Sequence, residues 1–468
     1  MKYTLFFYLL FQIAMLVAQQ DSEKHLTRYR YDSDGLTVSF HQERRAALRE
    51  KMEPNSISVF FANPIKNRSN DVDYEYHQDP NFYYLTGFTE PNAALVILKD
   101  SIFIDSKWTS EVLWIPERNP TKEVWDGRRL GPELAPEFLG FSTVKPNTKF
   151  DATIFNWKQY SSVNFIAENL YKSDINLSNQ LLAEMKLGFQ QAIQPKRVKK
   201  NEKQLKIWMA ELRQIKQPEE LVLMQKAIDI TLLAQIELMK SLKEEMTEYQ
   251  TEAIIEYVFK REGAEYPGFP SIQGGGENSC VLHYTSNRKK LANNHLLVSD
   301  VGAEYRGYTA DVTRTLPVDG VFSVEEKAIY NLVLKAQNAG IRACKPGNSF
   351  RSTHEASTEI IAEGLYQLGI LKDKRQVRKY FMHGTSHYLG LDVHDWGTYG
   401  NLESGNVITV EPGIYIAEGS DCDPKWWNIG VRIEDDILIT DSEPINLSEG
   451  APRTIEEIEE MMKMEAQF

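Results

Sequence analysis

The sequence predicts a two-domain protein of the α/β (α+β) class. Its 468 residues exceed what a single hydrophobic core normally contains. Short apolar runs rich in β-branched residues alternate with amphipathic segments. A basic, proline-containing stretch at 194–203 interrupts this alternation, as is usual at a domain boundary. We therefore expect an α/β domain over residues 20–195, a linker over 196–210 and a second domain over 211–468.

The first residues form the only strongly apolar run of the chain. Lys2 precedes an almost uncharged stretch from Tyr3 to Ala18, and the sequence then becomes polar again. This order is typical of a secretory signal peptide, and about 16 residues is shorter than the roughly 20 that cross a membrane. We expect a signal peptide over residues 1–19 and a periplasmic or secreted protein. The alternatives are a retained membrane anchor and a buried helix.

The composition limits the kinds of partner that the protein can have. The net charge is −13, and the chain has no long Lys/Arg tract. A basic face for nucleic acid or for an anionic membrane is therefore not expected, nor is stable membrane insertion. The cysteines, Cys280, Cys344 and Cys422, are widely spaced and form no disulfide framework. Stability therefore has to come from the hydrophobic core.

Three apolar runs predict strands in the N-terminal domain, at residues 56–61, 93–98 and 163–167. The segment from His41 to Met52 carries apolar residues among charged ones and predicts a helix.

In the second domain, two helices are predicted by their first turns. Pro218 with two following acids begins one, which continues to about Leu242. Ser323 and Glu326 form a capping-box pattern for another, which ends near Cys344. Strand-like runs lie at residues 296–316, 407–416 and 429–440. Helix pairs followed by strand hairpins thus occur twice, which suggests internal pseudo-symmetry.

The segment 297–316 contains two acids in an otherwise apolar hairpin. A turn near Tyr305 and Arg306 would place Asp300 directly opposite Asp311. Like charges opposed across two strands destabilise a sheet, and a cation between them reverses that effect. The pair therefore predicts a cation site. In the alternative, the register differs and both acids face solvent.

A second pair of acids lies in the last strands of the chain. Glu411 follows an apolar run, and Glu434 lies within the strand-like segment on the same face as Arg432. A lone Glu at 434 would more often form a structural salt bridge with Arg432. Two such acids, in strands otherwise suited to burial, instead favour metal ligands.

Three of the nine histidines, His383, His387 and His394, fall within twelve residues. A neutral imidazole is a good ligand for Mn, Co or Zn, and others can donate hydrogen bonds to a developing oxyanion. Four carboxylates with one imidazole suit a pair of hard or borderline divalent ions rather than a structural zinc site.

Other motifs of catalysis or cofactor binding are incomplete. His354-Glu355 lacks the second histidine of a zincin helix, and the Gly384 segment is not a nucleophile elbow. Residues 274–279 lack both the third glycine of a dinucleotide turn and the lysine of a phosphate loop. We interpret that segment as a flexible loop near the site.

Together these residues resemble the pita-bread metallopeptidases, and aminopeptidase P (Xaa-Pro aminopeptidase) in particular. The resemblance extends over nearly all of the mature chain. It rests on the five candidate ligands and on family-like motifs at 82–91, 276–284, 311–315, 383–395 and 411–415. The fold that it implies is a creatinase/aminopeptidase P-type α/β domain followed by a pita-bread catalytic domain.

The resemblance also implies an activity, a cofactor and a role for each candidate residue. The enzyme would release the N-terminal residue from peptides with proline second, through a hydroxide bridging two divalent ions, most often Mn²⁺, with Co²⁺ or Zn²⁺ possible. Asp311 and Glu434 would bridge both ions, Asp300 would bind one ion, and His387 with Glu411 would bind the other. Glu411 would also shuttle a proton. The remaining residues would bind substrate or orient these groups: His283, His383, His394, Tyr415 and Arg432.

Several alternatives share these ligands or this fold. A prolidase has the same ligands but cleaves only dipeptides, and Arg432 could serve it by binding the substrate carboxylate. A methionine aminopeptidase lacks so large an N-terminal domain. A non-catalytic pita-bread peptide-binding protein would be expected to have lost ligands, and all five are present here. We further expect a homo-oligomer, either a dimer or a tetramer.

Overall fold

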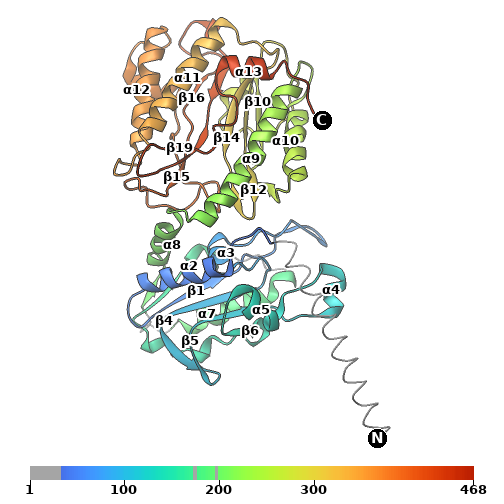
Figure 1. Cartoon of the computed structure of the whole chain (residues 1–468), viewed down its shortest axis with the longest axis vertical. Helices are drawn as coiled ribbons and strands as arrows, with labels where there is room; N and C mark the ends of the chain where they lie inside the picture. Colours follow the sequence, from blue (N-terminus) through green and yellow to red (C-terminus); the bar gives the residue numbers. More distant parts are fainter. Residues whose placement is uncertain (1–32, 172–176, 195–198, 468) are drawn as a thin grey trace. The chain divides into compact units, whose positions relative to one another are not determined.

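The computed structural model describes residues 33–171, 177–194 and 199–467. The signal peptide expected over residues 1–19 lies outside these ranges. The chain divides into two compact units, Met1–Met209 and Ala210–Phe468 (Figure 1). The division falls within α8 (Gln204–Arg213), so the segment expected as a linker is partly helical. In the described part of the chain, no helix is long and apolar enough to cross a membrane.

The first unit is built around one mixed six-stranded sheet with the order β6-β5-β4-β1-β7-β8. Strand β1 pairs antiparallel with β4 and parallel with β7. The helices and strands of this unit are α2 (Val38–Lys51), β1 (Ser56–Phe61), β2 (Asn67–Ser69), β3 (Val72–Asp73), α3 (Pro80–Thr86), β4 (Ala94–Ile104), β5 (Lys107–Ile115), α4 (Pro120–Asp126), α5 (Gly131–Leu139), β6 (Val144–Pro146), β7 (Ser162–Phe165), α6 (Ala167–Tyr171), α7 (Gln180–Ala192) and β8 (Lys200–Asn201).

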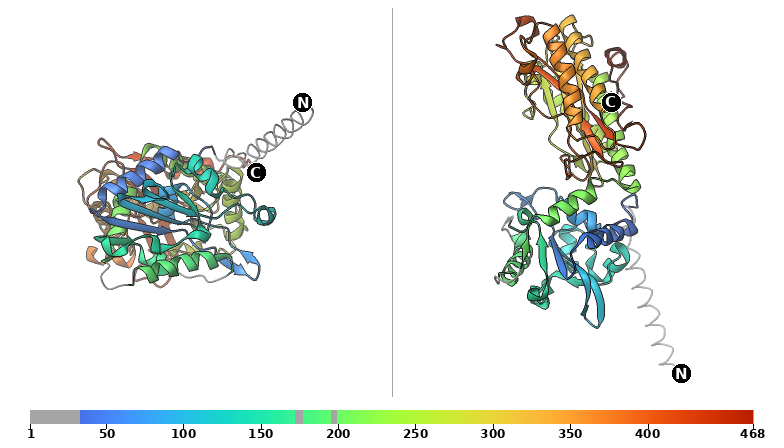
Figure 2. Two further views of the ribbon diagram at one scale, coloured as in Figure 1. Left: turned by 90° about the horizontal axis from the view of Figure 1, so that it is seen from below. Right: turned by 90° about the vertical axis from the view of Figure 1, so that its left-hand side faces the viewer.

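Helices α2 and α7 cover opposite faces of this sheet (Figure 2). Alternate residues of the fully buried β1, Ile57, Val59 and Phe61, share one hydrophobic cluster with Met185 and Phe189 of α7. Because successive side chains of a strand point to opposite faces, the intervening residues of β1 face the α2 side. Both faces of β1 are buried, and four of its six residues, Ile57, Val59, Phe60 and Phe61, are apolar. The pattern over 56–61 therefore predicts its bounds correctly.

Three other predicted elements of this unit differ at their ends. Strand β4 begins as expected but continues to Ile104, and β7 ends at Phe165 because Ala167 begins α6. Helix α2 starts earlier than predicted, at Val38, where the Thr37 hydroxyl accepts a hydrogen bond from the Phe40 backbone N–H.

The second unit repeats the order of a helix pair followed by strands, as the sequence predicts. Its first half consists of α9 (Pro218–Ser241), α10 (Glu248–Arg261), β9 (Tyr266–Pro267), β10 (Ile272–Gly275), β11 (Leu296–Val301), β12 (Ala303–Tyr305), β13 (Tyr308–Thr309) and β14 (Val312–Pro317). Its second half consists of α11 (Val324–Arg342), α12 (Ser352–Gln367), β15 (Val407–Val410), β16 (Gly413–Ile416), β17 (Ile429–Arg432), β18 (Asp435–Leu438), β19 (Ile445–Asn446) and α13 (Ile455–Met461).

Each half packs its helix pair against its strands. Helices α11 and α12 lie side by side in Figures 1 and 2, and α9 contacts α10. The strands form small sheets, β10-β11-β14 and β13-β12-β9 in the first half and β15-β18-β19 and β16-β17 in the second. The predicted start of α9 at Pro218 and the Ser323 capping box of α11 are both confirmed.

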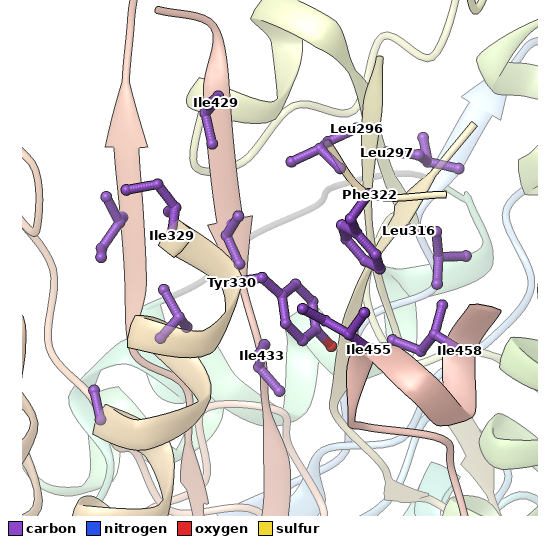
Figure 3. Packing of buried hydrophobic residues seen from close by; sticks show 14 of the residues in the cluster. Leu296, Leu297, Leu316, Phe322, Ile329, Tyr330, Ile429, Ile433, Ile455 and Ile458 are labelled. Atoms are coloured by element: carbon purple, nitrogen blue, oxygen red, sulfur yellow. The ribbon is translucent and has the colours of Figure 1, made fainter. Parts of the chain in front are cut away.

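A single large hydrophobic cluster joins the two halves of the second unit. In Figure 3, Tyr330 of α11 lies among Phe322, Ile433 and Ile455. The rings of Tyr330 and Phe322 are 4.9 Å apart between centroids. The Tyr330 hydroxyl donates a hydrogen bond to the Arg453 carbonyl oxygen at 2.9 Å, so its polar end is satisfied in the core. This core holds the strands that carry the candidate site.

Candidate metal centre

The hairpin between β11 and β14 turns at Arg306 and Gly307. Both residues have positive φ angles, 51° and 82°, as a two-residue type I′ turn requires. Tyr305 and Tyr308 pair across this turn. The turn therefore lies one residue later than the sequence predicts.

This shift changes which residues face one another across the hairpin. Asp300 pairs with Thr313 and not with Asp311, so the predicted direct opposition of the two acids is wrong. Moving the turn by one residue moves the register by two, and a strand has a period of two. Asp300 and Asp311 therefore stay on the same face of the hairpin, as diagonal neighbours.

Asp300 and Asp311 are buried together, with relative exposures of 7% and 5%. Burial raises the pKa of Asp311 well above its usual range, and the charge of Asp300 raises it further. Within the described ranges, no hydrogen-bond partner reaches the Oδ1 atom of either residue. Buried carboxylate oxygens of this kind require a partner, and a cation would supply it.

Glu434 lies between strands and not within one. The expected continuous strand is interrupted, because β17 ends at Arg432 and β18 begins at Asp435. The Glu434 backbone N–H donates to the Thr313 carbonyl oxygen at 3.1 Å, and the Thr313 hydroxyl donates to Glu434 Oε2 at 2.6 Å. Burial raises the pKa of Glu434, and the charge of Asp311 adds to this shift. Thr313, which sequence reasoning missed, thus orients a candidate ligand.

Glu411 directly follows β15, and its backbone N–H donates to the Thr385 carbonyl oxygen at 2.9 Å. Burial raises the pKa of Glu411 to about 7, although His387 and Arg432 act in the opposite direction. The Thr385 hydroxyl in turn lies 3.0 Å from His354 Nδ1. His354, whose motif is incomplete as a zincin, therefore supports the backbone next to the site.

His387 points its Nε2 atom at the acids. This atom lies 3.4 Å from Asp311 Oδ2 and 3.8 Å from Glu411 Oε1. On the other side of the ring, Nδ1 lies 3.1 Å from the Tyr388 carbonyl oxygen. A carbonyl oxygen only accepts, so Nδ1 carries the proton and the lone pair of Nε2 faces the acids. One ligand atom each from Asp311, His387 and Glu434 lies within 4.8 Å of the other two.

His383 is held as a neutral ring by similar contacts. Its Nδ1 atom lies 2.6 Å from the Gly384 carbonyl oxygen, so the Tyr415 hydroxyl donates to Nε2, at 2.9 Å. Burial, with the positive charge of Arg432, lowers the pKa of His383 to about 4. Burial likewise raises the pKa of Tyr415 to about 12. Both groups therefore keep these protonation states near neutral pH.

Arg432 pairs with Asp300 rather than forming the salt bridge with Glu434 that was the alternative. The distance from Arg432 Nη2 to Asp300 Oδ2 is 2.6 Å, and Nη1 donates to the Tyr415 hydroxyl oxygen at 2.9 Å. Nη2 also donates to the Leu282 carbonyl oxygen at 3.3 Å. The guanidinium thus joins one candidate ligand to two segments that carry candidate substrate-binding residues.

His394 and His283 lie at the exposed side of the cluster. The rings of His394 and His387 are 4.5 Å apart between centroids. Burial lowers the pKa of His394, and positive charge on His387 and His283 lowers it further. These exposed rings can contact a substrate, whereas the candidate ligands Asp300, Asp311 and Glu434 are buried.

The segment that carries the histidines is anchored by a buried ion-pair network that sequence reasoning missed. Asp395, fully buried, contacts Arg213 and lies 2.9 Å from Lys216 Nζ. Burial raises the pKa of Asp395, but Arg213 and Lys216 outweigh this effect and hold it below its usual value. The Trp396 backbone N–H completes the shell at 2.9 Å. Asp395 directly follows His394, so this network fixes the backbone of that histidine.

Residues 274–279, expected as a flexible loop, adopt regular structure instead. Ile272–Gly275 is β10, paired with β11, and Gly276–Cys280 is a 3₁₀ helix. Gly274 and Gly276 explain the glycine content, because a Cβ at Gly274 would lie 2.7 Å from the Asn278 carbonyl oxygen, and Gly276 has a φ of 59°. These glycines therefore permit close packing near the site.

The structure brings all five candidate ligands into one cluster, and their chemistry fits divalent metal ions. Four carboxylates and an imidazole Nε2 are donors for hard or borderline cations. The unpartnered Oδ1 atoms of Asp300 and Asp311 supply the negative charge that such ions neutralise. A buried acidic cluster with adjoining histidines, in a domain of two similar halves, defines the class of a metal-dependent hydrolase with a pita-bread fold.

Two family models match the chain. Residues 222–441 match metallopeptidase family M24, and residues 41–165 match the aminopeptidase P N-terminal domain. The Xaa-Pro aminopeptidase of Escherichia coli strain K12 is 38% identical over 433 residues, covering 90% of this chain and 97% of that protein. The mitochondrial intermediate cleaving peptidase 55 of Arabidopsis thaliana is 31% identical over 444 residues, covering 94% and 86%.

Solved structures agree with these matches. The structure of aminopeptidase P from E. coli with the inhibitor Pro-Leu has a TM-score of 0.82 and 35% identity, covering 92% of this chain and 99% of that chain. The chain therefore belongs to metallopeptidase family M24, as an enzyme with both domains of aminopeptidase P. The expected fold and family are confirmed.

Proposed function

We propose that this enzyme removes the N-terminal residue from peptides with proline in second position, at two divalent metal ions. The observation that carries the proposal is the buried pair Asp300 and Asp311, each with an Oδ1 atom that has no hydrogen-bond partner among the described residues. Asp311 also lies within ligand distance of His387 and Glu434. The 38% identity to an Xaa-Pro aminopeptidase over 90% of the chain supports the same reaction.

Five side chains would hold the ions. Asp311 and Glu434 would contact both, Asp300 one, and His387 with Glu411 the other. Mn²⁺ is our first choice, with Co²⁺ and Zn²⁺ as alternatives, because carboxylate-rich sites with a single imidazole favour such ions. When bound, the ions supply positive charge that activates water and polarises the scissile carbonyl.

The other residues act on the substrate and its protons. Glu411 takes up a proton during attack and delivers it to the leaving amine. His394 donates to the oxygen that gains negative charge, and His283 and His383 bind the carbonyl and the proline. Tyr415 and Arg432 fix His383 and Asp300 through the hydrogen bonds described above.

The burial and the contacts of Arg432 favour an aminopeptidase over a prolidase. A prolidase must bind the substrate's C-terminal carboxylate with a basic group, and Arg432 was the candidate. That guanidinium is only 3% exposed and is occupied by Asp300, Tyr415 and the Leu282 carbonyl. The inhibitor Pro-Leu in the E. coli structure is also a peptide with proline first, which is the kind of product that this reaction leaves.

Product analysis on three peptides tests the proposal. The purified enzyme with Mn²⁺ is incubated with Ala-Pro, Ala-Pro-Ala and Ala-Ala-Ala, and products are identified by mass spectrometry. We expect free alanine and Pro-Ala from the second peptide, little cleavage of the first and less of the third. Cleavage of Ala-Pro alone would identify a prolidase, and equal cleavage of Ala-Ala-Ala would remove the proline requirement. Metal binding without cleavage of any peptide would favour a non-catalytic binding protein.

Location and assembly are further parts of the proposal. The apolar run from Tyr3 to Ala18 supports export to the periplasm or outside the cell. N-terminal sequencing of the mature protein tests this, because export with cleavage removes about the first 19 residues. We also propose a dimer or a tetramer, which light scattering would measure.

A further inference from the structure

Glu248, at the start of α10, is a buried residue that no candidate role accounts for. Its exposure is 0%, yet both carboxylate oxygens are fully engaged. Oε1 accepts from the Gly275 backbone N–H at 3.0 Å and from Asn278 Nδ2 at 2.9 Å. Oε2 accepts from the Tyr284 hydroxyl at 2.8 Å and from the Lys289 backbone N–H at 2.7 Å. All four donors belong to one segment, residues 275–289.

The backbone around Glu248 holds the end of the same segment. The Glu248 N–H donates to the Lys289 carbonyl oxygen at 2.9 Å, and Thr247 forms an isolated bridge with Lys290. One residue further on, the Leu291 N–H donates to the Met246 carbonyl oxygen at 2.8 Å. Glu248 therefore joins the two ends of 275–289 to the first turn of α10.

The carboxylate of Glu248 is stabilised by hydrogen-bond donors and not by an ion pair. Within the part of the chain that the structure describes, no Lys or Arg side chain forms a salt bridge with it, and the nearby Lys289 ammonium pairs with Glu277 instead. Hydrogen bonds to an ionised acceptor are about twice as strong as neutral ones. Leaving such a buried acceptor unsatisfied is costly. The four donors are therefore held firmly in one arrangement.

The middle of this segment carries His283, next to the candidate metal site. Its neighbour Leu282 accepts a hydrogen bond from Arg432 through the carbonyl oxygen, and Arg432 also binds Asp300. Ser279 accepts one from the Gly430 backbone N–H at 3.0 Å. The segment is thus fixed at the site on one side and by Glu248 on the other, with the exposed imidazole between.

We propose that Glu248 is a positioning residue that holds segment 275–289 so that the imidazole of His283 meets the substrate. This inference rests on the proposed function, in which His283 binds the scissile carbonyl or the proline. Glu248 itself touches neither the substrate nor the candidate ligands, so its effect has to pass through His283.

The substitution Glu248→Gln tests the proposal, because an amide group replaces one acceptor oxygen and cannot accept from its two donors. We expect kcat/KM on Ala-Pro-Ala with Mn²⁺ to fall by roughly 10–100-fold, the usual effect of losing a supporting partner of a site. Metal content should stay at the wild-type level. Glu326→Gln is the matched control: it also changes an acid in a helix's first turn, but Glu326 bonds Ser323, and activity should not change.

A double-mutant cycle separates positioning from general destabilisation. If Glu248 acts through His283, then Glu248→Gln should lower kcat/KM by less than about twofold in a His283→Ala background. Tyr284→Phe removes only one of the four donors and provides a milder second variant. Its loss of kcat/KM should be smaller and should also disappear in the His283→Ala background.

Equal losses with and without His283 would overturn the proposal, and so would wild-type kinetics of Glu248→Gln. If Glu248→Gln does not fold, the Tyr284→Phe cycle decides by the same criterion. A fully active His283→Ala variant would also overturn the proposal, because Glu248 would then have no substrate-binding ring to position. An inactive wild-type enzyme would instead contradict the proposed function, which keeps the two failures distinguishable.

Discussion

The two halves of the catalytic domain share an order of elements but hold their site residues differently. In the first half, Asp300 lies within β11 and Asp311 directly precedes β14, so the hairpin register fixes their separation. In the second half, His387, Glu411 and Glu434 all lie outside the strands. Their positions depend on individual hydrogen bonds.

The two halves also differ in the chemical roles of their site residues. The hairpin acids of the first half offer only negative charge, which ions require. The irregular segments of the second half carry groups that also donate hydrogen bonds or transfer protons, such as His394 and Glu411. Variants of the first half should therefore lose metal and activity together, whereas some variants of the second half should separate the two.

The largest effect is expected for Asp311→Asn. An amide cannot supply the negative charge that two ions share, so several kcal/mol of transition-state stabilisation should be lost, equivalent to roughly 10³-fold or more in kcat/KM. Metal content, measured by mass spectrometry of the purified protein, should fall in parallel. The control Asp319→Asn, an exposed acid after the same hairpin, should keep both. Full turnover with metal still bound in Asp311→Asn would refute the assignment.

His394→Ala should separate activity from metal binding within the second half. Loss of one oxyanion donor typically lowers turnover by roughly 10²–10³-fold, and metal content should remain near the wild-type level. His387→Ala, on the neighbouring ring only 4.5 Å away, should instead lose metal. If His394→Ala purifies without metal and His387→Ala retains it, the two roles have been exchanged.

Chelation should lower the stability of the catalytic domain. Ions that bind only the folded state add about 2.7 kcal/mol at a hundredfold excess over Kd. Thermal unfolding with and without chelator measures this difference. An unchanged midpoint after confirmed metal loss would argue against ions bound tightly among these acids.

The stability of the metal-free enzyme should also depend on pH. The folded-state pKa of Glu411 is raised to about 7, and that of Asp311 is raised as well. A raised pKa means that the folded state binds more protons than the unfolded state. Protonation of these acids therefore stabilises the folded state, and this stabilisation is lost as pH rises from about 4 towards 7. The destabilisation by chelator should therefore be larger at pH 7 than at pH 5, and the reverse order would contradict burial of unpaired acids.

The smallest effect is expected for Tyr415→Phe. The lost hydroxyl bridges Arg432 Nη1 and His383 Nε2, both at 2.9 Å. One hydrogen bond to a charged group is worth about 1.5 kcal/mol, or roughly tenfold in kcat/KM. Steady-state kinetics should show this loss with unchanged metal content, whereas the exposed Tyr366→Phe should be neutral. A loss as large as that of Asp311→Asn would place Tyr415 among the essential groups.

The sequence predicted elements well where burial alone determines them. Strand β1 and the start of α9 follow from apolar spacing and a first-turn proline, and both are local signals. The hairpin register was wrong because Arg306, not glycine, occupies the first positive-φ position of the turn. The break at Ile433 and Glu434 was missed because β-branched residues occur on both sides of it, such as Val431 in β17 and Ile437 in β18.

The candidate ligands were predictable because acids in apolar strands are unusual. The residues that hold the site in place through hydrogen bonds were not predictable. Thr313, Asp395 and Glu248 are ordinary residue types, and each acquires its role from partners distant in the sequence. Asp395, for example, meets Lys216 across 179 positions. Pattern and spacing carry no signal for such contacts.

The most direct test of this account is a metal titration of the wild-type enzyme. The metal-free protein is titrated with Mn²⁺ while bound metal and cleavage of Ala-Pro-Ala are measured together. If both halves of the domain hold the ions jointly, activity should be absent without metal and should reach its plateau at two equivalents per chain. Full activity in the metal-free protein, or a plateau of activity with no metal bound, would contradict the central claim.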